Sequence, residues 1–316
     1  MTAHVGPDGD TLGSMLALKF ALEKGRGNFQ RIDCVISGKM PDVYHFLPGI
    51  RDVLRFEQDQ GKLLPKYDMA ISVDCGSLDR LGPNGAYFDA ADISVNIDHH
   101  ISNDKFGKLN VVIPEAAASG EVVFDLLKEM KIALDANIAT CLYTAIVTDT
   151  GGFKYGNTTA KVMETAGQLV QAGANPEYIF KQLYEEQPYE QMMMQADAFL
   201  RTEYTQDKSI GWTTVLKSDL EKFGALDEHV DGLVEVIRRV KPVLVSAVFK
   251  EMRSGHTKVS LRSDTHDIDV SKIMGIFGGG GHKMAAGCTI EETPEKARKK
   301  VLPLLEEAVQ KKQLVR

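Results

Sequence analysis

Short apolar runs alternate with helical patterns through the first part of the chain, and this alternation restricts the possible folds most. The runs at 31–37, 67–74 and 92–98 are β-branched, of strand length and almost continuously apolar, as in buried parallel strands. The stretches "LGSMLALKFALEKG", "SGEVVFDLLKEM" and "ANIATCLYTAIVTDTG" have the length and spacing of helices. The pattern predicts an α/β domain with a doubly wound, mainly parallel sheet and helices on both faces. In such sheets functional residues gather just beyond the carboxyl ends of the strands.

The second part of the chain predicts a smaller mixed α/β domain. Residues 158–200 are mostly helical, and their segment "QPYEQMMMQADAFL" favours helix packing of its methionines over a cofactor role. Strands are expected at 209–215, 242–252 and 256–263, and helices at about 228–239 and 294–312. We therefore expect a first domain over 1–185, a helical linker over 186–204 and a second domain over 205–316, with the active site in the cleft between the domains.

The composition excludes several classes of protein. No stretch approaches the roughly 20 apolar residues of a membrane span, and the first 20 residues carry acids where a signal peptide is basic and apolar. A cytoplasmic protein with no membrane partner is therefore expected. The cysteines form no C-x-x-C pair and are predicted to be small buried residues without disulfides: Cys34, Cys75, Cys141 and Cys288.

The charge is unevenly distributed along the chain. Its net value is −7 overall, −10 over residues 1–200 and +3 over residues 201–316. The overall value argues against a protein that coats long nucleic acid. The split favours an acidic first part that holds cations and a mildly basic second part that holds a short anionic substrate.

Oxygen and imidazole side chains gather at the predicted ends of strands and helices. The loop "HVGPDGDTLGS" alone has two interpretations, since its turn-forming residues could simply let Asp10 or Thr11 cap a helix. Three further segments, "SVDCGSLDRLG", "NIDHH" and "IVTDTGG", supply residues of the same types. The candidates are His4, Asp8, Asp10, Asp74, Asp98, His99, His100 and Asp149. Crowded carboxylates need cations, and thiolate-free Asp and His sets suit Mn²⁺, Mg²⁺, Co²⁺ or Fe²⁺.

Taken together, the motifs resemble those of the DHH phosphoesterase family. Its four motifs correspond to "HVGPDGD", "VDCGSLDRLG", "DHH" and "TDTGGFKY", and "GGGGHKMAAG" at 278–287 resembles the glycine-rich motif of the DHH-associated C-terminal domain. The resemblance implies a catalytic first domain with two divalent cations, Mn²⁺ above all, with Mg²⁺ or Co²⁺ as alternatives. It further implies that Asp74 bridges the two ions, one held with His4 and Asp8, the other with Asp10, His99 and Asp149. Such a pair can share and acidify a water that attacks phosphorus.

The resemblance also suggests roles for residues beside the ions. His100 is expected to donate to the phosphate or to act as general acid on the leaving oxygen. Asp98 is expected to orient an imidazole ligand through its far ring nitrogen, with a purely structural role as the alternative. Together with Asp74 these two form the predicted catalytic set. The predicted substrate contacts in the second domain are Arg262, Ser263, Gly280, Gly281 and His282, with Lys283 a weaker candidate beside Ser263.

Within the family, length and layout are similar to the bacterial branch that acts on short RNA and on 3'-phosphoadenosine 5'-phosphate. The expected partner is therefore short RNA or a mono- or dinucleotide, and a homodimer is left open. The alternatives are a phosphodiesterase acting on c-di-AMP or linear dinucleotides, and a nucleotide sensor whose catalytic site has decayed. Only three residues precede His4, so the strand that should lead into the first motif is expected to be very short or to be missing from this sequence.

Overall fold

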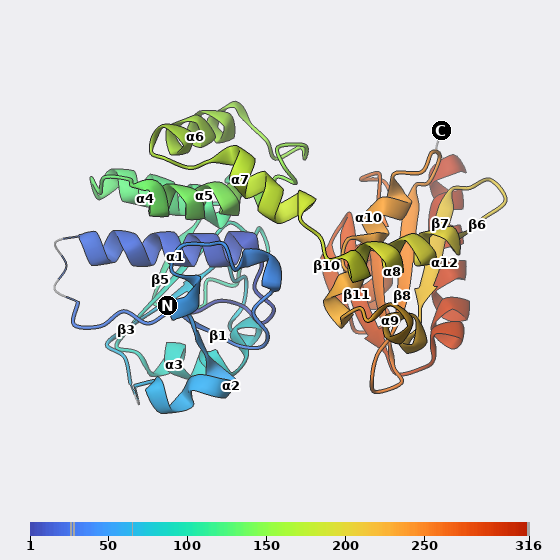
Figure 1. The fold of residues 1–316 in the computed structure, drawn as a ribbon, viewed down its shortest axis with the longest axis horizontal. Coiled ribbons are helices and arrows are strands. Elements are labelled where there is room, and N and C mark those ends of the chain that lie inside the picture. The colour runs from blue at the N-terminus through green and yellow to red at the C-terminus, as the bar shows by residue number, and fades with distance from the viewer. Residues whose placement is uncertain (26, 28, 65, 315–316) are drawn as a thin grey trace. The chain divides into compact units, whose positions relative to one another are not determined.

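The computed structural model describes residues 1–25, 27, 29–64 and 66–314. The chain forms two compact units, Met1–Glu186 and Gln187–Arg316, each with its own sheet and helices (Figure 1). Both units mix helices with strands, which confirms the predicted α/β class.

Parallel strands form the centre of unit 1. Three of them lie in the order β3-β4-β5, and two more pair as β1-β2. Their bounds are β1 Val35–Ile36, β2 Leu54–Arg55, β3 Met69–Val73, β4 Ile93–Asp98 and β5 Leu109–Val112. The apolar runs at 31–37, 67–74 and 92–98 thus become β1, β3 and β4, as predicted.

The expected strand before His4 is a single bridging residue. Thr2 makes parallel bridges to Val35 of β1 and to Ser72 of β3. The Thr2 N–H donates to the Ile71 carbonyl at 2.8 Å, and the Val35 N–H donates to the Met1 carbonyl at 2.9 Å. Thr2 therefore lies between β1 and β3 and joins the two sets of strands. The first motif, which begins at His4, thus closely follows a residue that is paired within the sheet.

Helices cover both faces of these strands. The α-helices of unit 1 are α1 Gly9–Lys24, α2 Phe56–Asp59, α3 Gly85–Ala90, α4 Ser119–Glu129, α5 Ala136–Asp149, α6 Ala160–Gln171 and α7 Pro176–Phe180. Short 3-10 turns lie at Asp42–Tyr44, Ile50–Asp52, Gln60–Lys62 and Leu78–Asn84, and a π-helical turn lies at Lys181–Glu185. One face packs Phe88 of α3 with Ala70 and Leu81, and the larger core lies on the other face.

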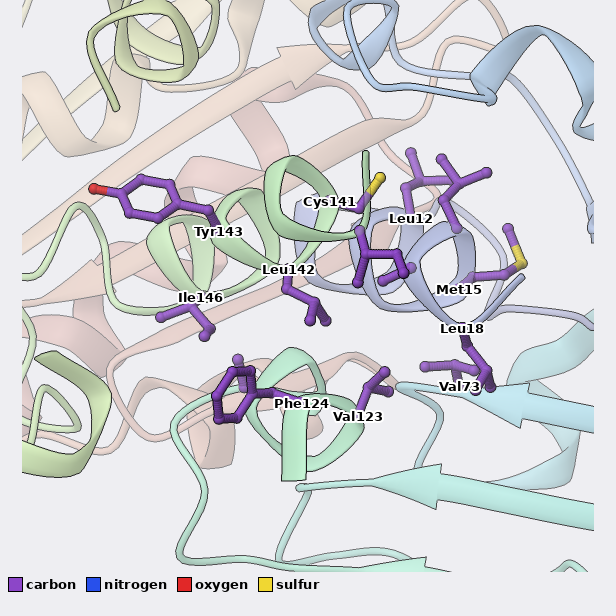
Figure 2. Packing of buried hydrophobic residues seen from close by; sticks show 14 of the residues in the cluster. Leu12, Met15, Leu18, Val73, Val123, Phe124, Cys141, Leu142, Tyr143 and Ile146 are labelled. Atoms are coloured by element: carbon purple, nitrogen blue, oxygen red, sulfur yellow. The ribbon is translucent and has the colours of Figure 1, made fainter. Parts of the chain in front are cut away.

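The larger core of unit 1 fills the space among α1, α4, α5 and β3 (Figure 2). Fully buried side chains such as Leu12 of α1 and Leu142 of α5 meet there, each contributing roughly 1.5–3 kcal/mol by leaving water. Helices α1 and α5 approach closely because residue 13 is glycine, since a Cβ at Gly13 would lie 2.3 Å from the Cys141 carbonyl oxygen. This close contact holds the start of α1 and the end of α5 in one rigid body.

Unit 2 is built on a mixed sheet with strand order β10-β11-β9-β8-β7-β6. Among its described strands, β7 and β8 pair in parallel and the other neighbours pair antiparallel. The strands are β6 Glu203–Tyr204, β7 Ile210–Val215, β8 Val245–Glu251, β9 Thr257–Ser263, β10 Gly280–His282 and β11 Ala285–Ile290. The helices are α8 Tyr189–Leu200, α9 Lys217–Phe223, α10 Leu233–Arg238, α11 Val270–Gly275 and α12 Pro294–Leu314, with a 3-10 turn at Asp227–Val230.

Two apolar clusters cover the two faces of this sheet. Phe249 of β8 packs with Val301 of α12, whereas its neighbour Val248 packs with Met194 of α8 and Leu233 of α10. Helix α8, which falls in the stretch expected as a linker, is therefore an integral part of unit 2. Of the three consecutive methionines, Met194 is fully buried, and its role is helix packing.

Two expectations from composition can be compared with the structure. The four cysteines all lie in the described part of the chain, and all are buried and free, as predicted. Among the described helices, none combines the length and apolar character needed to cross a membrane.

Candidate metal centre

The predicted ligands lie where strands and helices of unit 1 end. Asp74 directly follows β3, Asp98 is the last residue of β4, and Asp149 is the last residue of α5. Asp8 caps α1, accepting the Thr11 N–H at 3.0 Å. The first loop does contain a helix cap, but the cap is Asp8 and not Asp10 or Thr11, the two residues that the capping interpretation named. The same Asp8 carboxylate also faces the other ligand candidates.

A first group of donor atoms comes from His4, Asp8 and Asp74. One ligand atom of each lies within 4.8 Å of the others. The Thr11 hydroxyl lies among them, 2.9 Å from Asp8 Oδ1, 2.6 Å from Asp74 Oδ2 and 2.9 Å from His4 Nε2. This hydroxyl shows that the three donors converge on one small space.

A second group comes from Asp10, His99 and Asp149, again within 4.8 Å of one another. His99 Nε2 lies 3.2 Å from Asp149 Oδ2 and 3.7 Å from Asp10 Oδ2. It also lies 3.7 Å from Asp74 Oδ1, whereas Asp74 Oδ2 is the oxygen near His4. Asp74 therefore presents one oxygen to each group, which is the arrangement of a bridging carboxylate.

The backbone of Asp74, the residue that faces both donor groups, has an unusual conformation. Its φ of 56° lies in the left-handed region, which costs a non-glycine residue roughly 1–2 kcal/mol. Aspartate is among the residues that tolerate the region best. Strain of this kind persists where the surrounding structure enforces it, and it is common at functional sites.

Electrostatic repulsion among the carboxylates is strong. Burial, followed by the charges of Asp74, Asp149 and Asp8, raises the pKa of Asp10 well above its ordinary value. Burial, followed by Asp74 and Asp8, does the same to the pKa of Asp149. The nearby thiol of Cys75 instead donates to the Ser77 carbonyl at 3.1 Å. Hard carboxylate and imidazole donors without thiolates fit two divalent cations of the Mn²⁺ or Mg²⁺ type.

The two histidines of the DHH tripeptide are oriented by different partners. His100 Nδ1 lies 2.7 Å from Asp98 Oδ1, whereas His99 Nδ1 donates to the Ala116 carbonyl at 3.2 Å. Asp98 thus orients an imidazole, but that of His100 and not the predicted ligand His99, which corrects the expectation. Although burial would raise it, the pKa of Asp98 is lowered by His100 and by Asn103, whose amide donates at 2.5 Å.

The same ion pair acts on the imidazole. Burial alone would lower the pKa of His100, but its bond to Asp98 and the charge of Asp74 raise it. The protonated ring is therefore favoured, as a proton donor requires.

Sequence reasoning missed the start of α4, which contacts Asp10 and the Asp74 oxygen on the side of His99. The backbone N–H groups of Ser119 and Gly120 donate to the two oxygens of Asp10 at 2.6 and 2.8 Å, and the Ser119 hydroxyl donates to Asp74 Oδ1 at 3.1 Å. Free N–H groups at the start of a helix attract anions. The Ser-Gly pair that opens the predicted helix "SGEVVFDLLKEM" was a usable signal for this contact.

In unit 2 the structure brings most of the predicted substrate contacts together. Arg262 of β9 and His282 of β10 are both paired with Ala285 of β11, so they flank the same residue. Gly281 has a φ of 138°, and a Cβ there would lie 2.4 Å from the Ala285 carbonyl oxygen, so only glycine fits. Gly280, the first residue of β10, and Lys283, in the turn that follows β10, are both exposed.

Arg262 and Ser263 have quite different surroundings. Arg262 Nε donates to Glu235 Oε1 at 2.7 Å, and the two side chains line a cavity with Lys250 and Lys258. Ser263 is only 1% exposed, and its hydroxyl donates to the Thr265 carbonyl at 2.8 Å. Its hydroxyl stabilises a turn, so the structure does not place Ser263 with the other predicted contacts.

Comparison with known proteins identifies both units. Residues 1–146 match the model described as "DHH family, N-terminal domain", and residues 213–311 match the "DHHA1 domain". A Thermus thermophilus protein named bifunctional oligoribonuclease and PAP phosphatase NrnA is 32% identical over 92% of this chain and 83% of its own length. The Bacillus subtilis protein of the same name is 28% identical over 93% of this chain and 90% of its own length.

Among solved structures, an exopolyphosphatase-related protein from Bacteroides fragilis is similar along the whole chain. It has a TM-score of 0.89 and 25% identity, and the match covers 99% of this chain and 92% of that protein.

Proposed function

The chain belongs to the DHH family of phosphoesterases, and from this premise we propose that it hydrolyses short oligoribonucleotides and 3'-phosphoadenosine 5'-phosphate. The observation that supports this proposal most is the position of Asp74, whose two oxygens face two separate groups of donors. The relatives in Thermus and Bacillus carry both activities in their names. The alternative of a decayed sensor has little support, because a suitable donor occupies every predicted ligand position.

The residues of unit 1 would hold two divalent cations, and we propose Mn²⁺, with Mg²⁺ or Co²⁺ as alternatives. His4, Asp8 and Asp74 would hold one, and Asp10, Asp74, His99 and Asp149 the other. When bound, the ions would neutralise the phosphate charge and acidify an attacking water. Phosphoryl transfer depends mainly on such positioning and charge neutralisation, so no protein nucleophile is required.

His100 would supply a proton beside the phosphate. Its Nδ1 faces Asp98, so the nitrogen that serves the substrate is Nε2. The ion pair with Asp98 would fix the plane of the His100 ring and stabilise its protonated form. The ring could then donate a proton to the leaving oxygen as the phosphate ester bond breaks. Asp98 is therefore proposed as a positioning residue, and His100 as the proton donor.

Residues of unit 2 would bind the phosphate at the other end of the substrate. The planar fork of Arg262 suits a terminal phosphate, and the backbone of Gly280 and Gly281 allows close approach with His282 nearby. Ser263 is not included in this proposal because its hydroxyl is buried.

A substrate panel tests the proposal. With Mn²⁺ present, we expect RNA of two to five nucleotides and 3'-phosphoadenosine 5'-phosphate to be hydrolysed faster than a 24-mer RNA, pyrophosphate or c-di-AMP. Equal or faster cutting of the 24-mer would contradict the preference for short RNA, and a preference for c-di-AMP would favour a cyclic-dinucleotide phosphodiesterase.

Two variants test whether the site is catalytic. Asp74→Asn and His99→Ala should abolish hydrolysis while nucleotide binding is kept, because both remove a ligand that the substrate does not need for binding. If both variants hydrolyse the panel like the unmodified protein, the metal-centred mechanism is wrong.

A further inference from the structure

Glu121 is a buried acid that the mechanism above does not use. It lies in the first turn of α4 and is 2% exposed. Its Oε2 accepts the Ala117 N–H at 2.8 Å, and its Oε1 lies 3.1 Å from Lys161 Nζ of α6. A carboxylate is rarely buried to this degree unless both of its oxygens have specific partners.

The peptide that Glu121 contacts is the one that orients His99. The Ala117 N–H and the Ala116 carbonyl belong to the same planar peptide group, and that carbonyl accepts His99 Nδ1–H at 3.2 Å. A continuous line of hydrogen bonds thus runs from the Glu121 carboxylate through one rigid peptide to the ring. An acceptor that holds the N–H side of a planar peptide also fixes the direction of its carbonyl, to which the ring donates.

A second contact fixes the next peptide of the loop. The Asn157 amide donates to the Ala117 carbonyl at 3.1 Å and to the Asp149 carbonyl at 3.1 Å. The backbone near His99 and the backbone of Asp149 are therefore tied together. His99 and Asp149 both belong to the second donor group.

We propose that Glu121 is a positioning residue for the second metal site. Through the 116–117 peptide it holds the proton of His99 on Nδ1, so that Nε2 points to Asp10 and Asp149 as an unprotonated ligand. Glu121 itself would touch neither metal nor substrate. Its effect would be on the affinity of the ion that Asp10, His99 and Asp149 would hold. The inference rests on the two-metal site of the proposed function.

A matched pair of variants tests the role. Glu121→Gln keeps an oxygen that accepts the Ala117 N–H, whereas Glu121→Met has similar volume and only a weak sulfur acceptor. By titration of the metal-free protein with Mn²⁺, followed by electron paramagnetic resonance, Glu121→Met should weaken the second ion by about 10–100-fold and leave the first unchanged. Glu121→Gln should stay within about threefold of the unmodified protein. Asp125→Asn, which removes the other partner of Lys161, is the control and should change neither ion.

Three results would overturn the role: Glu121→Met binding both ions normally, Glu121→Met weakening both ions equally, or Glu121→Gln behaving like Glu121→Met. If Glu121→Met does not fold, the tautomer of the His99 ring can be measured by ¹⁵N NMR instead. The measurement compares the metal-free Glu121→Gln variant with the metal-free unmodified protein. Both should show the Nδ1-protonated tautomer, and a different tautomer in the unmodified protein contradicts the proposal. Because Mn²⁺ binding is read without substrate, failure of the substrate panel alone refutes the proposed substrates and not this role.

Discussion

Asp10 and Asp149 are carboxylates whose charge the folded chain accommodates poorly without a cation. The pKa of each is raised, first by burial and then by neighbouring carboxylates. A raised pKa means that the folded chain keeps protons that the unfolded chain has already lost. The contribution of these groups to stability therefore falls as pH rises from the ordinary carboxyl value toward the raised one. At neutral pH the metal-free fold carries a repulsion that bound cations would relieve.

Removing one of these charges should stabilise the metal-free protein. Asp149→Asn should raise the free energy of unfolding of the metal-free protein at pH 7, because the raised pKa of Asp149 shows that its charged form is disfavoured in the fold. It should also reduce the rise in Tm that Mn²⁺ produces. Thermal unfolding with chelator and with Mn²⁺ measures both effects, and Asp125→Asn on the surface is the control. A lower Tm of metal-free Asp149→Asn would show that the repulsion is unimportant.

Asn103 should affect the rate and not the metal. Its amide donates to Asp98 Oδ2, so Asn103→Ala frees the carboxylate that orients His100. We expect kcat to fall about tenfold with little change in KM or in Mn²⁺ affinity, because none of the described Asn103 contacts involves a predicted metal ligand. Steady-state kinetics on a short RNA and Mn²⁺ titration measure this. Asn110→Ala, at an exposed position of strand β5, is the control, and an unchanged kcat contradicts the role of the Asn103–Asp98 contact.

Residue types indicated the candidate side chains, and the resemblance to the DHH family grouped them into two ligand sets, but neither indicated every partner. His4, Asp8 and Asp74 were predictable because carboxylates and imidazoles at strand ends have few other uses, and the structure brings them together. Which imidazole Asp98 serves depends on how two adjacent rings point, and that is set by the turn after β4. The burial of Ser263 likewise depends on the turn that follows β9.

At the scale of elements, the start of α4 joins the donor groups to the helical core. Gly120 both donates to Asp10 and packs against α5, where a Cβ would lie 2.5 Å from Ala145 Cβ and 3.5 Å from Asp10 Oδ1. Neither α5 nor the carboxylate can move away easily, because the interface among α1, α4 and α5 is fully packed.

Gly120→Ala should therefore lower both stability and metal affinity. Overpacking of this kind costs roughly 1–3 kcal/mol, despite the better helix propensity of alanine. The control is Gly167→Ala in α6, where a Cβ meets nothing within 4 Å, so a gain of roughly 0.5–1 kcal/mol is expected. Chemical denaturation and Mn²⁺ titration of the two variants test this. Equal stability of both variants would mean that the contact between α4 and α5 adapts.

The elements that could be predicted are those with a strong hydrophobic period. Strands β3 and β4 lie within the predicted runs because both faces of each are covered. Strand β5 was missed because its Leu109 and Asn110 are exposed, which leaves no continuous apolar run. The bridge at Thr2 was not predictable either, since one residue has no pattern and pairs only because its neighbours form the sheet.

At the scale of the molecule, each unit has its own core and a different chemical task. The donor groups all lie in unit 1, and apart from His100 the predicted substrate contacts lie in unit 2. Within the described chain, the clusters of buried apolar residues also divide between the units. Binding of a cation should therefore stabilise one unit without stabilising the other directly.

Mn²⁺ should raise the unfolding temperature of unit 1 alone. A ligand at 100 times its dissociation constant stabilises the folded state by about 2.7 kcal/mol, or roughly 5–10 °C for a unit of this size. Calorimetry of the full chain should show one transition that moves with Mn²⁺ and one that does not. In amide hydrogen exchange, Mn²⁺ should protect the backbone near β3, β4 and α4. Addition of 3'-phosphoadenosine 5'-phosphate should instead protect β9 to β11. Equal protection of both units by Mn²⁺ alone would contradict this division, because unit 2 would then share the metal-binding equilibrium.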